Sequence, residues 1–486
     1  MAANDTIADA HPVACPPEIR RCQIHRLTTG TAAMPAGEPT ATRSVRHRVS
    51  RRGMLKIGAL GGTGFSLAEL LRCRSQATAN HSPPDTSVVW VWMQGGAPHL
   101  ETFDPKMNSP SDYRSMVGAL STRLPGVEFG GLFPGLAASA QRMAIVRSFH
   151  HTNPDHLGAS HFVMTANDNP GGSTQQTKPS LGSITACVRG ANRVGSGIPT
   201  FVRLKPTVSF DFDQPLWLGR ANAPFDAGGG ARKNLSLSVD PRQLADRRGL
   251  LRRLDRLRRD VDHTDTMAGM DAFEQQACDL VLGATHDVFK LDQEKQSVRA
   301  RYGPGLGEQL LTARRLCEAG CGFVTLTYGW APQPAETPFA WDMHLGPSQP
   351  NAPPMDKQLR AICPPLDHAL TAFLDDVAQR GLSERILLVL TGDFGRTPKI
   401  NAYGGRDHWP GLSTLALAGG GLRMGQVVGR SSSKGEYPAA SPVEPKDLMA
   451  TLFHVLGVNA QLQFPDYGGR PHYLLPEGAR PIADLI

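Results

Sequence analysis

The chain has 486 residues, 40% of them hydrophobic and 20% charged, which is the composition of a globular protein and excludes a disordered one. Its formal net charge of +7 comes almost entirely from the N-terminus: residues 1–79 hold 11 Lys and Arg against 5 Asp and Glu, whereas the remaining residues hold 40 against 39. The nearly neutral body argues against nucleic-acid binding, and no apolar run reaches the ~18 residues of a membrane span.

The N-terminal region has the pattern of an export signal. Residues 1–49 show no hydrophobic periodicity and are predicted to be disordered. Arg51-Arg52, followed by an apolar pair and a Lys, resembles a twin-arginine signal. Residues 57–71 are mildly apolar and Gly-rich, and residues 77–79 (Ala-Thr-Ala) offer a cleavage site. We therefore expect recognition by the twin-arginine machinery and export to the periplasm or the extracellular space; an Arg-rich helix start is the alternative.

These features divide the chain into three parts. Residues 50–79 form the expected signal peptide, and residues 80–486 form the expected mature domain, in which no transmembrane segment is predicted. The eight cysteines are scattered and include no CxxC pair, which argues against a zinc finger or a redox motif.

Strand-like and helix-like segments alternate along the body. Short apolar runs predict the strands Val88–Met93, Met143–Val146, Phe323–Thr327, Ile386–Leu390 and Leu412–Ala418. Apolar residues at helical spacing predict the helices Arg242–Asp262, Asp271–Leu282, Glu308–Ala319, Pro364–Arg380 and Pro445–Leu456. The alternation predicts an α/β fold with a mostly parallel sheet flanked by helices, and a helical insertion at about residues 190–300.

The polar residues gather where the predicted strands end. The strand at Ile386–Leu390 leads to Asp393 and Arg396, and then to Asp407-His408. Ligands of open α/β sheets bind outside the carboxyl ends of the strands, which favours a functional loop here. A surface loop with an Asp393–Arg396 salt bridge is the alternative.

Two further loops follow the same pattern. His99 and Asp104 come after the first strand, beyond a turn enforced by Gly95-Gly96, and Asp342 and His344 come after the strand at residues 323–327.

The segment after the second strand is rich in histidine. His156 and His161 belong to a group of four histidines within twelve residues, and their spacing of five places them only partly on one helix face. We take Arg396, His156 and His161 as candidate catalytic residues.

Several long motifs resemble the bacterial family catalogued as domain of unknown function 1501, over roughly residues 85 to 486. They are GGAPHLETFDPK (95–106), VRSFHHTNPDHLGASHFVMT (146–165), ARRLCEAGCGFVTL (313–326), WDMH (341–344), GDFGRTPKIN (392–401) and GRDHWP (405–410). The family resembles the alkaline-phosphatase and sulfatase superfamily in fold, and its members often carry export signals. The resemblance implies a scaffold and a site, not a substrate.

This sequence departs from its nearest patterns at three places. Ala97-Pro98 precedes His99 where many relatives have Pro-Ser, so no serine nucleophile exists there. The sulfatase signature, Cys or Ser followed by x-Pro-x-Arg, is absent, which disfavours a formylglycine sulfatase. Asp393 is followed by Phe394, where metal phosphatases commonly have Asp-His, which weakens the case for a second metal site.

The residue types suit a divalent metal, namely zinc, calcium, magnesium or manganese. Carboxylate oxygen and imidazole nitrogen are the usual ligands of zinc and similar ions. Asp342, His344 and His408 are the best trio for one ion, and Asp393 with His99 or Asp104 is the pair for another. The alternative for each single histidine is a structural hydrogen bond.

The sequence thus supports an exported metal-dependent hydrolase of phosphate or sulfate esters. A small anionic ester or a glycan is the expected substrate, and Arg396 is expected to bind its anionic oxygens. Thr102, Thr152, Ser160 and a water activated by the metal remain open as nucleophiles. The alternative is an exported, non-catalytic protein that binds a ligand or partner on the same fold.

Overall fold

The computed structural model describes residues 85–168, 176–205, 212–228, 243, 246–247, 249–250, 285–329, 340–466 and 468–486. An eight-stranded sheet with the order β12-β4-β11-β8-β1-β7-β5-β6 forms its centre. The strands are β1 (Ser87–Met93), β4 (Ala144–Val146), β5 (Phe201–Lys205), β6 (Phe225–Asp226), β7 (Phe323–Tyr328), β8 (Ile386–Gly392), β11 (Leu415–Gly419) and β12 (Gln426–Val428).

The central strand β1 is parallel to both of its neighbours, β7 and β8. β11 alone runs antiparallel to its partners β8 and β4 in this sheet. The predicted mostly parallel α/β sheet is therefore confirmed. Met93, the last residue of β1, pairs with Tyr328 of β7 and with Gly392 of β8, so the three strands end together at one edge.

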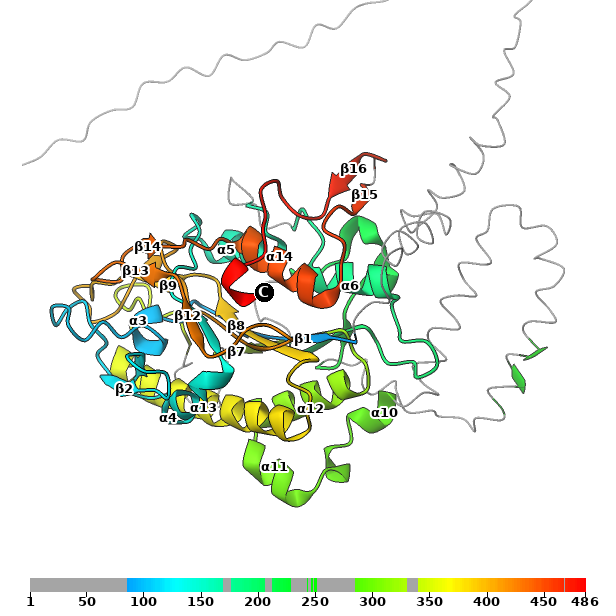
Figure 1. Cartoon of the computed structure of the whole chain (residues 1–486), viewed down its shortest axis with the longest axis horizontal. Helices are drawn as coiled ribbons and strands as arrows, with labels where there is room; N and C mark the ends of the chain where they lie inside the picture. Colours follow the sequence, from blue (N-terminus) through cyan, green and yellow to red (C-terminus); the bar gives the residue numbers. More distant parts are fainter. Residues whose placement is uncertain are drawn as a thin grey trace, which may run out of the picture. The chain divides into compact units, whose positions relative to one another are not determined.

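Helices cover both faces of the sheet (Figure 1). One face carries α5 (His156–Thr165), α6 (Leu181–Arg189) and α14 (Pro445–Leu456). The other carries α4 (Pro134–Ser139), α11 (Gln296–Tyr302), α12 (Leu306–Glu318) and α13 (Met355–Gln379). Burial on both sides explains why β1 is apolar at nearly every position instead of alternating.

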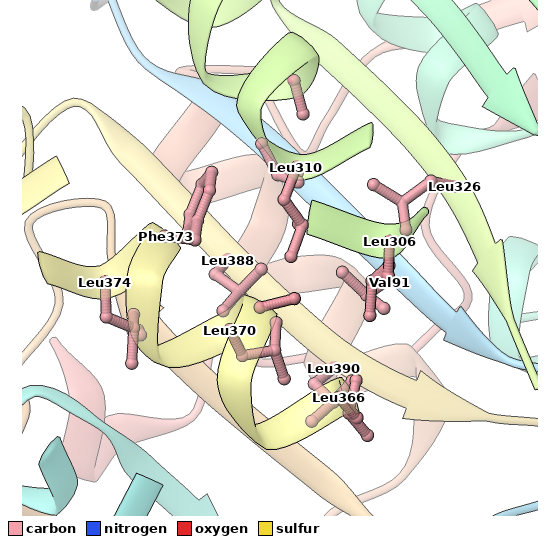
Figure 2. Close-up of a cluster of buried hydrophobic side chains, with 14 of the residues drawn as sticks. Val91, Leu306, Leu310, Leu326, Leu366, Leu370, Phe373, Leu374, Leu388 and Leu390 are labelled. Atoms are coloured by element: carbon pink, nitrogen blue, oxygen red, sulfur yellow. The ribbon is translucent and has the colours of Figure 1, made fainter. Parts of the chain in front are cut away.

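Successive side chains of a strand point to opposite faces, and β1 supplies both cores in this way. Val89, Val91 and Met93 pack with α12 and α13, whereas Val88, Trp90 and Trp92 pack with α6 and α14. Figure 2 shows the first core, where Val91 and Leu388 from the strands meet the leucines of the covering helices. The two cores fix the sheet, and with it the edge that carries the polar loops.

α13 begins at Met355, nine residues before the predicted start at Pro364. Proline is favoured in the first turn of a helix and is costly inside one. Pro364 and Pro365 instead lie inside the helix on its exposed side, where water can bind the carbonyls that lose their N–H partners. The carbonyl of Ile362 accepts a hydrogen bond from the Tyr328 hydroxyl at 2.7 Å.

Of the other predicted strands and helices, some are confirmed, one is shorter than expected and two lie mostly or entirely outside the described residues. The strand expected from Leu412 begins at Leu415, and the helix expected at Pro445–Leu456 has these bounds. The helix predicted at Asp271–Leu282 lies outside the described residues, as does most of the one at Arg242–Asp262.

The remaining elements are short. They are α3 (His99–Thr102), α10 (Thr285–Val288), β2 (Ala119–Ser121), β3 (Glu128–Gly130), β9 (Gly395–Arg396), β10 (His408–Trp409), β13 (Arg430–Ser431), β14 (Pro438–Ala440), β15 (Gln463–Pro465), β16 (Pro471–Tyr473) and the 3-10 turns η1 (Ala140–Arg142), η2 (Leu216–Leu218), η3 (Arg220–Asn222), η5 (Leu291–Gln293) and η6 (Ala483–Leu485). Among the helices that the structure describes, none combines the length and apolar character needed to cross a membrane.

Candidate functional site

Asp393 lies directly beyond the end of β8 and is fully buried. Its Oδ2 accepts hydrogen bonds from the backbone N–H of Gly95 at 3.1 Å and from Nδ1 of His156 at 2.6 Å. Its Oδ1 is buried without a hydrogen-bond partner among the described residues. A buried carboxylate oxygen without a partner is costly, and a bound cation is one group that satisfies it.

Asp342 is the centre of the polar cluster. Its Oδ1 lies 2.6 Å from Nη2 of Arg396, 3.2 Å from Nε2 of His408 and 3.6 Å from Nε2 of His156. Nε2 of His344 lies 3.4 Å from its other oxygen, Oδ2. Burial would raise the pKa of Asp342, but the histidines and the Arg396 charge hold it well below its usual range. Asp342 is therefore ionised and surrounded by nitrogen atoms.

A tight turn brings Asp342 to the sheet edge. Gly95 has a φ of +101°, and a Cβ at this position would lie 2.7 Å from the backbone nitrogen of Asp342. A side chain in this conformation is strained, and its Cβ would push Asp342 away. The Gly95-Gly96 turn predicted from the sequence thus allows the loops after β1 and β7 to touch.

The two imidazoles that flank Asp342 have their orientations fixed from behind. His408 directs Nδ1 to the carbonyl oxygen of Pro154 at 2.9 Å, and His156 directs Nδ1 to the Asp393 carboxylate. Each acceptor requires a proton on Nδ1, so a neutral ring presents the lone pair of Nε2 to Asp342. Burial lowers the pKa of His156, but the carboxylates of Asp342 and Asp393 raise it to about 9. Without a cation, a proton on His156 offsets the negative charge.

The described residues contain one cluster of three groups with the spacing of a metal site. One ligand atom from each of His156, Asp342 and His408 lies within 4.8 Å of the other two. The three residues are half-buried, and the His156 and His408 rings are 4.4 Å apart. Three separate segments supply them, namely the start of α5, the loop after β7 and β10.

Arg396 is buried and holds the loops together. Its Nε donates to the carbonyl of Gly96 at 3.0 Å, its Nη1 to that of Arg406 at 3.2 Å, and its Nη2 to Gly95 and Asp342. Burial lowers the pKa of Arg396, an effect that the charge of Asp342 opposes. The structure directs this guanidinium at the protein interior, where it orients Asp342.

His344 lies on the other side of Asp342. Its Nδ1 is 3.0 Å from the carbonyl oxygen of Leu345, and its own carbonyl accepts a bond from the Asn401 amide at 2.7 Å. The structure therefore brings His344 to Asp342 but outside the group of three.

The first-strand loop directs its polar side chains elsewhere. His99 is buried, its Nε2 lies 2.9 Å from the carbonyl oxygen of Gly435, and burial lowers its pKa to about 4. Asp104 pairs with Lys106 at 3.3 Å and with Arg147 at 3.4 Å. These contacts do not bring either residue to Asp342.

His161 has both ring nitrogens engaged. Nδ1 lies 2.8 Å from the carbonyl oxygen of Asn167, and Nε2 accepts the backbone N–H of Thr177 at 3.1 Å. The hydroxyls of Thr102 and Ser160 are buried, whereas Thr152 is exposed.

Two contacts of the site were missed by sequence reasoning. Gln349 donates Nε2 to the Asp342 backbone oxygen at 3.0 Å and to its Oδ2 at 3.2 Å. Glu101 and Arg406 form an ion pair in which both side chains are fully buried. The one signal in the sequence that could have indicated a role for Arg406 is its position two residues before His408.

The geometry defines a class of protein, an α/β protein with a His- and Asp-lined site at the carboxyl edge of a mostly parallel sheet. The chain belongs to the family described as "Protein of unknown function (DUF1501)", whose model matches residues 85–486. The resemblance noted in the sequence is thereby confirmed. Comparison with curated proteins returns no match.

Several solved structures show low similarity to the chain. They include a phosphonate monoester hydrolase from Silicibacter pomeroyi (12% identity, 82% of this chain and 73% of that chain, TM-score 0.35) and the PsFucS1 sulfatase from Pseudoalteromonas sp. (12%, 82% and 73%, 0.35). A protein in the alkaline phosphatase superfamily from Vibrio parahaemolyticus is similar at 12% identity, with 82% and 78% covered and a TM-score of 0.35. At these TM-scores, the neighbours' activities describe those proteins only.

Proposed function

We propose that the chain binds a divalent cation through Nε2 of His156, Nε2 of His408 and the carboxylate of Asp342. The observation that carries the proposal is the orientation of the two rings, each with Nδ1 directed at a carboxylate or carbonyl oxygen and Nε2 at Asp342. Metal-binding histidines typically donate their second ring N–H to such an oxygen. The buried Oδ1 of Asp393, which lacks a partner in the described part of the chain, adds negative potential beside His156.

The donor set narrows the choice of ion. Two imidazoles and one carboxylate suit zinc, whereas calcium, magnesium and manganese prefer oxygen ligands. Of the four candidate ions from the sequence, zinc thus fits the site best.

We further propose that the site hydrolyses phosphate or sulfate monoesters. A divalent cation supplies positive charge that polarises an ester oxygen and lowers the pKa of water. Arg396 keeps Asp342 in place, and Asp393 keeps the proton of His156 on Nδ1. His344 lies beside Asp342 outside the ligand set, and we assign proton transfer to it. Because Arg396 is buried, the role expected from the sequence, binding of the substrate's anionic oxygens, is not part of this proposal.

A non-catalytic binding protein is the second candidate. It is favoured by the burial of Thr102 and Ser160, each 1% exposed, which removes two of the three hydroxyls considered as nucleophiles. A protein of this kind would bind the cation and turn over no ester.

The test is elemental analysis together with a panel of 4-nitrophenyl phosphate and sulfate esters. Wild type should retain zinc after desalting, and His408→Ala and Asp342→Asn should lose metal and turnover together. The exposed His454 lies on α14, outside the cluster, so His454→Ala is the matched control and should keep both. Metal without turnover supports the binding protein. A folded wild type without metal refutes the cation site.

Export is part of the same proposal. Arg51-Arg52 and the stretch that follows support recognition by the twin-arginine machinery, which carries folded proteins. A site assembled from distant segments exists only in the folded chain, so this route would allow the metal to be loaded before export.

A further inference from the structure

The site borders on a cavity of about 550 Å³, lined by the segment after His344, the start of α13 and the turn at Tyr403-Gly404. Gln349 lines the cavity, and the same side chain donates to the carboxylate of Asp342 at 3.2 Å. Binding pockets for small organic molecules have volumes of roughly 300–1,000 Å³. The cavity therefore has the right size and place to receive the organic part of an ester held at Asp342.

The cavity wall is shaped by a backbone turn that is costly to form. Leu345 has a φ of +56°, in the left-handed region that leucine rarely adopts, and Gly346 follows with a φ of +90°. A Cβ at Gly346 would lie 2.9 Å from the ring of Tyr403. Backbone strain of this kind is common at ligand sites. The turn places Tyr403 against the wall, and this side chain is 60% exposed.

The chemistry of the wall discriminates between organic groups. Among the described residues that line the cavity, Gln349, Asp356 and Tyr403 carry the polar side-chain atoms. Gln349 is already committed, since Oε1 accepts the backbone N–H of Leu345 at 3.1 Å and Nε2 donates to Asp342. A sugar needs several hydrogen-bond partners for its hydroxyls, and this wall supplies few. Asp356 adds a negative charge, which disfavours an anionic group.

We propose that the cavity binds the aryl group of an aromatic monoester, with the ring against Tyr403. That the aryl group belongs to an ester rests on the proposed function, whereas binding of the aryl group to the cavity does not. Aromatic pairs contribute about 0.5–1.5 kcal/mol beyond the area that they bury. The expected substrate class is thus narrowed from anionic esters and glycans to aryl esters.

The test measures binding of 2-naphthol by fluorescence titration, which needs neither metal nor turnover. Ala352 is a half-buried lining residue, and Ala352→Trp places a bulky ring in the cavity where the aryl group would lie, so it should weaken binding at least tenfold. Tyr403→Ala removes the stacking ring and should weaken binding about three- to tenfold. Tyr473 in β16 is 56% exposed and does not line the cavity, so Tyr473→Ala is the matched control and should bind as wild type does.

The outcomes separate this inference from the proposed function. Loss of naphthol binding in the two cavity variants supports the aryl site, even if no ester is hydrolysed. Wild-type binding that neither variant weakens overturns it, even if esters are hydrolysed. Glucose should not compete with naphthol, and competition at equal concentration would also overturn the preference for an aryl group.

Discussion

The buried ion pair between Glu101 and Arg406 gives a sharp test of how the site loops are held. Oε1 of Glu101 accepts from Nε and Nη2 of Arg406 at 3.1 and 3.0 Å. Oε2 accepts from the Ser115 hydroxyl at 2.7 Å and from the Met116 N–H at 3.0 Å. Both charged side chains are 0% exposed. Every oxygen lone pair of this carboxylate thus faces a donor.

Glu101→Gln keeps the shape and removes the charge. The new amide NH₂ must face either the guanidinium or the two donors at Ser115 and Met116, so one side sets donor against donor. Breaking a buried ion pair by removing one partner costs about 3–5 kcal/mol, because the other charge stays buried without compensation. We expect a loss of that size in the free energy of unfolding.

Urea unfolding followed by circular dichroism measures this loss, with the slope compared between variants to exclude a change in the unfolded state. The exposed Glu128 in β3 provides the control, and Glu128→Gln should change stability by less than about 0.5 kcal/mol. A Glu101→Gln protein within about 1 kcal/mol of wild type would show that Arg406 does not depend on the carboxylate.

Three further predictions follow from the sequence and the site. Burial lowers the pKa of His99 to about 4, so between pH 6.5 and 4 the unfolded chain binds a proton that the folded chain excludes. The free energy of unfolding should therefore fall by about 3 kcal/mol as the pH drops through this window. The pH dependence of stability should be flatter in His99→Gln, and equal slopes in the two proteins would contradict the reasoning. A chelator should lower the melting temperature of wild type, since a ligand at 100 times its Kd stabilises by about 2.7 kcal/mol, whereas His408→Ala should not respond; an equal response in both would place the metal elsewhere. Replacing Arg51 and Arg52 by Lys should trap the protein in the cytoplasm in a fractionation assay, whereas Arg72→Lys should be exported; unchanged export of the double variant would refute the twin-arginine reading.

The strands of the fold could be predicted because their apolar runs are visible in the sequence. Val88–Met93 and Ile386–Leu390 are continuous apolar segments too short for a typical helix, as is usual for strands of a sheet covered on both faces. The predicted start of α13 was wrong because proline favours the first turn of a helix, whereas Pro364 and Pro365 lie inside this one. The tertiary contacts of the helix, which no local pattern reports, decide between the two.

The sequence predicted the location of the site at the sheet edge, but not the contacts between its side chains. Asp393 could be placed at the carboxyl end of a strand, because that position follows from the apolar run before it. Its pairing with His156 joins residues 237 positions apart, and depends on where the start of α5 crosses the sheet. The burial of Glu101 in α3 and of Arg406 in the loop before β10 was not visible in the sequence, because charged residues usually lie at the surface.

The position of β1 in the sheet has a consequence for synthesis of the protein. Ser87 at the start of β1 pairs with Ile386 of β8, and the other neighbour, β7, begins only at Phe323. At about 5–20 residues per second, a ribosome needs tens of seconds to make the chain between β1 and its partners. During this time the Val- and Trp-rich strand has both edges unpaired, which is a template for aggregation. We expect the nascent chain to need a chaperone that holds this segment until the last third of the protein has emerged.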